Sequence, residues 1–111
     1  MLTIRKEQWR ALNAPFVETF ERNAVRYIAE SQPAKYAEMG DAKARELVRE
    51  AMAMGARYSV EYEDDLEALA VIFARLYPAR FEATAWAMEV LADRTLPPDA
   101  RVGLLAARMG D

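Results

Sequence analysis

Apolar residues recur along most of the chain at the three- and four-residue spacing of one helix face. The clearest stripe lies in residues 15–31 and consists of Phe16, Phe20, Ala24, Tyr27 and Ile28. Polar residues fill the opposite face, as expected for an amphipathic helix with one buried side. Gln32 ends this predicted helix, because a residue that precedes proline is pushed out of the helical region.

A shorter helix is predicted over residues 4–13, and residues 35–39 are expected to form an irregular turn or a single helical turn. The next helix should begin at Gly40–Asp41, where Asp41 is a good cap residue. Its apolar face consists of Leu47, Val48, Ala51, Met52 and Gly55. Gly55 fits either a close packing contact or the end of this helix.

The segment from Gly55 to Pro78 carries the strongest helix signals in the chain. Ser59 is predicted to cap a helix over Val60–Leu76, with acidic residues in its first turn. The main apolar face consists of Leu66, Leu69, Ala70, Phe73, Leu76 and Tyr77, and Val71 and Ile72 widen it. A helix that is apolar nearly all round is expected at the centre of a fold.

Two further helices are predicted, one over about 83–92 and one from Leu96 to Met109, whose face includes Val102 and Leu105 and is widened by Leu104. No segment shows the apolar–polar alternation of a strand, and no linker or repeat divides the chain. We therefore expect an all-α fold: residues 1–111 as a single domain, a compact bundle of five or six short helices.

Composition excludes several classes of function but does not identify the function. The 111 residues carry a net charge of -3, which lacks the basic footprint of a nucleic-acid-binding protein. The N-terminus has no apolar signal region, and no apolar run approaches the roughly 20 residues that span a bilayer. We expect a cytoplasmic protein that binds neither nucleic acid nor membrane.

The chain has no cysteine and no histidine, so it lacks thiol chemistry, the usual general base and the usual transition-metal ligands. Its glycines form no phosphate-binding loop. The acidic residues between 61 and 67 are best explained as a helix start and a solvated face; the alternative is a carboxylate-based, metal-dependent enzyme. We expect no catalytic residue, no metal and no cofactor.

Two groups of residues are candidates for partner contacts. Arg45, Arg49 and Arg57 could form a basic patch, but the glutamates interleaved with them favour a mixed solvated face. Aromatic residues and arginine are enriched in interfaces, and the predicted contact surface consists of Arg57, Tyr58, Tyr62 and Asp65. The supply of aromatic and methionine side chains is also compatible with a homo-oligomer.

The order of these features resembles a family of small helical bacterial proteins encoded beside type VI secretion spike-tip (PAAR-type) proteins and toxin effectors. The residues that carry the resemblance are the Met-Leu-Thr-Ile-Arg-x-Glu-Gln opening, Phe20-Glu21, Ala56-Arg-Tyr-Ser-Val with Asp65-Leu, Phe81 and Trp86-Ala87. Ser59 stands where the family has glycine, and Pro78–Phe81 also departs from the family pattern.

The resemblance implies a non-enzymatic adaptor or co-chaperone whose partner is a toxin effector, the chaperone of that effector or a spike component. An immunity protein that neutralises a cognate toxin by covering its site with an acidic surface is the alternative. The resemblance implies no catalytic residue.

Overall fold

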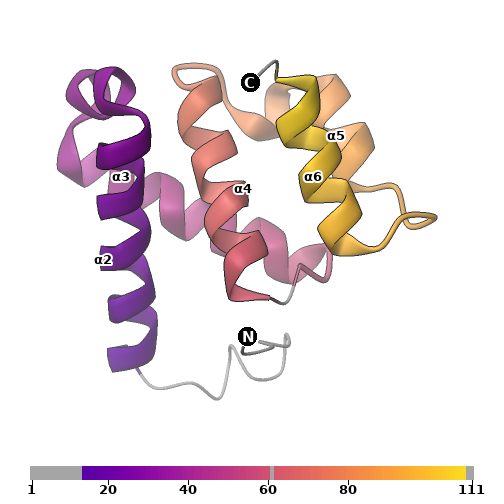
Figure 1. Ribbon diagram of the computed structural model, residues 1–111, viewed down its shortest axis with the longest axis horizontal. Coiled ribbons are helices and arrows are strands. Elements are labelled where there is room, and N and C mark those ends of the chain that lie inside the picture. Colours follow the sequence, from indigo (N-terminus) through magenta and orange to yellow (C-terminus); the bar gives the residue numbers. More distant parts are fainter. Residues whose placement is uncertain (1–13, 61, 110–111) are drawn as a thin grey trace.

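The computed structural model describes residues 14–60 and 62–109, which fold into helices joined by short turns (Figure 1). The helices are α2 (Ala14–Ser31), α3 (Pro33–Arg57), α4 (Glu63–Leu76), α5 (Ala85–Leu91) and α6 (Pro98–Arg108), with a short 3-10 helix, η1 (Phe81–Ala83). No strand occurs in the described ranges, so the predicted all-α bundle is confirmed. The helix predicted over 4–13 lies outside the described residues. Within those ranges, every helix is too short or too polar to cross a bilayer.

Helix α2 begins and ends where the apolar stripe predicts, and Phe20, Ala24 and Ile28 are buried. The side chain of Phe16 lies outside the part that the structure describes. The placement of Tyr27 in the buried stripe is wrong, because 45% of this residue is exposed. Tyr27 instead lines a groove together with Ala68 of α4 and Ala106 of α6.

Helix α3 consists of two helical stretches that meet at a kink, and the first stretch, which begins at Pro33, includes residues 35–39, where an irregular turn or a single helical turn is predicted. Gly40 interrupts it with φ 82° and ψ 165°, a conformation that glycine adopts without steric penalty. The helix resumes at Asp41, as predicted, but the Asp41 carboxylate accepts a hydrogen bond from Tyr36 and pairs with Arg45. Beyond this kink the predicted apolar face is buried.

The turn between α3 and α4 differs most from the prediction. Ser59 does not cap α4: it has φ 65°, in the left-handed region, and the helix begins at Glu63 with Tyr62 at the cap position. The Val60 amide donates to the Gly55 carbonyl at 2.8 Å, which closes the end of α3. A Cβ atom on Gly55 would overlap the Cδ2 of Leu66, so the predicted close packing contact is confirmed, whereas the helix itself continues to Arg57.

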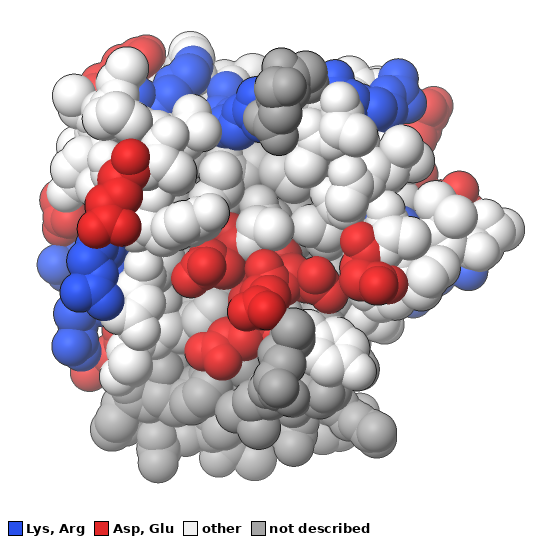
Figure 2. Space-filling model, viewed as in Figure 1, with Lys and Arg blue, Asp and Glu red and all other residues white. Residues whose placement is uncertain are grey.

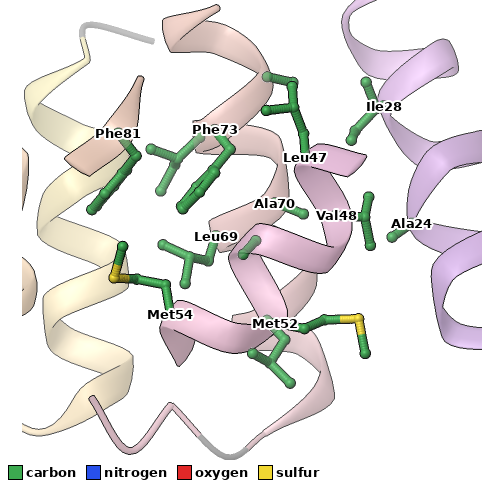
Figure 3. Packing of buried hydrophobic residues seen from close by; sticks show 14 of the residues in the cluster. Ala24, Ile28, Leu47, Val48, Met52, Met54, Leu69, Ala70, Phe73 and Phe81 are labelled. Carbon is green, nitrogen blue, oxygen red and sulfur yellow. The ribbon is translucent and has the colours of Figure 1, made fainter. Parts of the chain in front are cut away.

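Helix α4 is the central helix, as predicted, since it packs against α2, α3 and α6. Figure 3 shows Leu47 and Val48 of α3 turned toward Ala24 and Ile28 of α2. On the other side of α3, the rings of Phe73 and Phe81 stack with centroids 4.7 Å apart. Leu66, Leu69, Ala70 and Ile72 are also buried, whereas Leu76 and Tyr77 are only partly so.

Helix α6 is attached to the rest of the bundle by a buried arginine. Arg101 is 3% exposed, and its guanidinium donates to the carbonyl oxygens of Leu96 at 3.0 Å, Tyr58 at 2.9 Å and Leu91 at 2.7 Å. Burial lowers the pKa of Arg101 from its usual value. These bonds join α6 to the end of α5 and to the α3–α4 turn. Leu104, predicted to widen the apolar face of α6, is instead 40% exposed.

Candidate functional site

The four predicted contact residues lie around the α3–α4 turn. Arg57 is exposed at the end of α3, and its carbonyl accepts a hydrogen bond from Arg94 at 3.4 Å. The Arg94 guanidinium lies 5.6 Å from the centre of the Tyr58 ring, a cation–π contact. Tyr58 also packs against the core, so it contributes mainly to the fold.

Tyr62 and Asp65 lie at the start of α4. Tyr62 is 42% exposed, whereas Asp65 is half-buried. Arg57 lines a separate hollow beside Phe81, which none of the other three predicted residues lines. The predicted contact surface therefore stays a prediction, and the structure contains a second candidate site.

That site is a groove of about 290 Å³ between α2, α4 and α6. Its apolar lining comes from Ala68, Val71 and Ile72 of α4 and from Ala106 of α6. Tyr27 of α2 forms one edge, and its exposed ring extends the apolar surface. The groove exists because alanines occupy the positions where larger side chains would fill the space between the helices.

Two carboxylates, Asp64 and Glu67, line the groove. Burial raises the pKa of Glu67 above its usual value, and the negative charges of Asp64 and Glu63 raise it further. The pKa of Asp65 is also raised, first by burial and then by Asp99 and Asp64. The carboxylates at the start of α4 and the start of α6 repel one another. They are called the acidic cluster below and consist of Glu63, Asp64, Asp65, Glu67 and Asp99.

The acidic cluster dominates one face of the molecule. Figure 2 shows acidic side chains across the middle of this face, over the N-terminal half of α4 and toward α6. Lysine and arginine gather mainly along the top and left margins of the same view. Within the part of the chain that the structure describes, no ion pair joins a member of the acidic cluster to a cation.

The two ends of the groove differ in charge. Asp64 and Glu67 lie in the first half of α4, whereas Arg75, in its last turn, lines the groove farther along. Arg75 donates to the Met109 carbonyl at 3.4 Å, and Ser31 donates to the Tyr27 carbonyl at 2.7 Å. A bound segment would therefore meet negative charge at one end and positive charge at the other.

Folding explains the acidic cluster only in part. Glu63, Asp64 and Asp65 occupy the first turn of α4, and Asp99 the first turn of α6, where helix ends favour negative charge. Glu67 lies one turn deeper, and the raised pKa values of Asp65 and Glu67 show that burial and repulsion act against ionisation there.

The groove offers carboxylates and an apolar lining to a bound group. Among the described residues, no group of three or more acidic side chains has the geometry to hold a metal ion. Clustered carboxylates attract ammonium and guanidinium groups, and the apolar lining accepts hydrophobic side chains.

Sequence reasoning missed the groove for two reasons. Tyr27 shares the spacing of the buried stripe on α2, and nothing local shows that its neighbours across the interface are alanines. Asp99 is far from Asp65 in the sequence, so their proximity follows only from the packing of α6 against α4. The sequence shows the acidic residues of α4 as a cluster, but it does not show that an apolar groove lies beside them.

Comparisons of this chain with protein-family models, with curated proteins and with solved structures find no match.

Proposed function

We propose that this chain is a non-enzymatic protein-interaction module, and that its α2–α4–α6 groove binds a cationic, amphipathic segment of another protein. The observation that carries the proposal is the combination of an apolar groove with adjoining carboxylates that have no cationic partner among the described residues. Such a surface is complementary to a segment that presents apolar side chains on one face and lysine or arginine beside them.

The apolar lining would supply most of the affinity. Tyr27 and Val71 are accessible to a ligand, and covering their apolar surface stabilises a complex by about 25 cal/mol per Å² removed from water. A helical segment would place its apolar residues three and four positions apart along the groove. This is the same spacing with which the helices of the bundle pack on one another.

The acidic cluster would determine the orientation of the bound segment and the rate of association more than the affinity. A single exposed ion pair contributes about 0.2–1 kcal/mol, but several like charges together accelerate encounter with a cationic partner. Because Arg75 lies toward the opposite end from Asp64, a segment with its basic residues at one end would bind in one orientation. Binding of this kind should weaken as the salt concentration rises.

The resemblance described above supports a partner that belongs to a type VI secretion system: a toxin effector, the chaperone of that effector or a spike component. The chain would then act as an adaptor or co-chaperone. The acidic face also suits an immunity protein, which would cover a cationic site on a toxin. Deletion of the gene separates these roles: loss of an adaptor stops delivery and leaves the cell healthy, whereas loss of an immunity protein kills a cell that retains the toxin.

The proposed site can be tested by co-purification with the proteins encoded beside this one, followed by calorimetry on any complex. Val71→Arg places a charge in the apolar lining and should abolish binding. Asp64→Asn with Glu67→Gln should weaken binding several-fold and reduce its dependence on salt. The matched control is Glu38→Gln with Glu89→Gln, which removes equal charge from exposed sites outside the groove.

A complex that retains full affinity with Val71→Arg would exclude the groove as its interface. A chain that forms no complex with any neighbouring product would remove the support for the secretion-system partner. Thermal unfolding of each variant, followed by circular dichroism, distinguishes a lost contact from a lost fold.

A further inference from the structure

A second cavity, of about 560 Å³, lies between α2 and α3 and shares no lining residue with the groove described above. Arg22 and Arg26, one turn apart on α2, form one wall. Arg45 and Arg49, one turn apart on α3, form the other. The cavity therefore has two guanidinium groups on each side, in a chain whose net charge is -3.

The structure separates these arginines from the glutamates that interrupt them in the sequence. Glu46 and Glu50 follow Arg45 and Arg49 directly, and this interleaving favours a mixed solvated face. In the structure, Glu46 and Glu50 line a different hollow, together with Pro78. Helical geometry produces this result, because residues one position apart lie about 100° apart around the axis.

Carboxylates inside the cavity hold two of the guanidinium groups in place. Arg45 Nε lies 2.9 Å from a carboxylate oxygen of Asp41 in an ion pair, and the Tyr36 hydroxyl donates to the same carboxylate at 3.0 Å. Arg49 donates to Glu21, which is 7% exposed and so provides a fixed anchor. Each guanidinium has five N–H donors, and these contacts use only one or two of them.

The other wall is less engaged. Arg26 donates one hydrogen bond, to Asn23 at 2.7 Å, and Arg22 has no ion pair or hydrogen bond with the described residues. Four arginines face the carboxylates of Glu18, Glu21 and Asp41, so the lining keeps an excess of positive charge. Guanidinium groups that are oriented by carboxylates and retain unused donors are suited to the bidentate recognition of phosphate and carboxylate groups.

We propose that this cavity binds a small molecule that carries an oxyanion, either phosphate or carboxylate. The groups that bind the oxyanion are the guanidinium groups of Arg22, Arg26, Arg45 and Arg49. The volume exceeds that of the oxyanion alone and falls within the range of small-molecule sites. Val25 and Ala29 also line the cavity and offer apolar contact to the rest of such a molecule. This site is independent of the proposed protein-binding groove.

The test uses the full-length chain with inorganic phosphate, pyrophosphate and citrate as probes, at constant ionic strength set with sodium chloride. Calorimetry gives the affinities, and NMR spectra of the arginine Nε–H groups identify the residues that respond. We expect pyrophosphate or citrate to bind and to shift the signals of Arg22, Arg26, Arg45 and Arg49. Preference for pyrophosphate indicates a phosphate-bearing ligand, and preference for citrate indicates a carboxylate-bearing one.

Arg22→Gln with Arg45→Gln should weaken that binding at least tenfold, which corresponds to about 1.4 kcal/mol. The matched control is Arg57→Gln with Arg80→Gln, which removes two exposed arginines outside the cavity and should change the affinity less than twofold. An equal loss in the control, or the absence of binding by all three probes, would overturn the proposal. Arg22→Gln alone, at a side chain without a described partner, keeps the test valid if the double variant does not fold.

Discussion

Replacing Arg101 by methionine should destabilise the fold by about 2–4 kcal/mol, because three carbonyl groups lose their donor. The buried guanidinium donates to the carbonyls of Leu96, Tyr58 and Leu91, which belong to the segment before α6, to the α3–α4 turn and to the end of α5. Methionine retains much of the apolar volume of the arginine stem, so the substitution removes the hydrogen bonds with little loss of packing.

The magnitude follows from the surroundings of each carbonyl. The bond to Leu91 is buried, so its loss leaves an acceptor without a partner, at a cost of about 1–3 kcal/mol. The bonds to Leu96 and Tyr58 are only partly buried, so water can replace the donor and recover part of the loss. The Arg101 guanidinium is a buried charge with no ion-paired carboxylate among the described residues, and burying it costs free energy. Methionine removes this cost, so the net destabilisation is smaller than the sum of the lost hydrogen bonds.

Urea unfolding followed by far-UV circular dichroism measures this difference, with an unchanged m-value as the check that only stability has changed. Arg101→Lys should give an intermediate loss, because one ammonium group cannot reach three carbonyls that are arranged around a planar guanidinium. Hydrogen exchange should accelerate at Val60, in the turn that Arg101 holds. A loss below about 0.5 kcal/mol in Arg101→Met would refute this account of how α6 is attached.

Five further substitutions, at four positions, test the packing and the charges around α4. Gly55→Ala should cost about 1–2 kcal/mol, because its Cβ would overlap Leu66 and the gain in helix propensity offsets only part of the strain; chemical unfolding measures it, and a more stable variant would contradict the close contact. Ser59→Gly should stabilise the fold by about 0.5 kcal/mol by relieving a positive φ, and Ser59→Val should destabilise it; the opposite order would show that φ is not the cause. Asp65→Asn and Glu67→Gln should each stabilise the fold by a few tenths of a kcal/mol at neutral pH. The pKa of each carboxyl is raised in the folded state, from 3.8 for Asp65 and from 4.5 for Glu67, so ionisation of the carboxyl disfavours folding. This destabilisation sets in as pH rises from the ordinary pKa through the folded pKa, and it is absent below pH 3.8, where both carboxyls are protonated. The gain in stability of each variant should therefore vanish below pH 3.8, and a gain that persists there would contradict an electrostatic origin.

The helices of this protein could be predicted because they depend on local pattern. The spacing of Phe20, Ala24 and Ile28 reports a buried stripe, and Pro33 reports a break, whatever the rest of the chain does. Gly40 marks an interruption because only glycine accepts its backbone conformation without strain. Each of these signals lies within a few residues of the feature that it specifies.

The features that position the groove depend on residues far apart in the sequence. Arg101 reads as an ordinary charged residue at the start of a helix, and only the arrangement of the carbonyls around it explains its burial. Ser59 reads as a cap, but the tight closure of α3 by the bond from Val60 to Gly55 requires a left-handed residue there.

Site-specific photo-cross-linking tests the central claim most directly, namely that the α2–α4–α6 groove is the partner-binding site. A benzophenone amino acid at Tyr27, in the groove, should form an adduct with one partner protein in cells, at a peptide with lysine or arginine beside apolar residues at helical spacing. The same amino acid at Leu104, which is similarly exposed on α6 but does not line the groove, should form far less. Equal adducts from both positions, or an adduct from Leu104 alone, would contradict the claim.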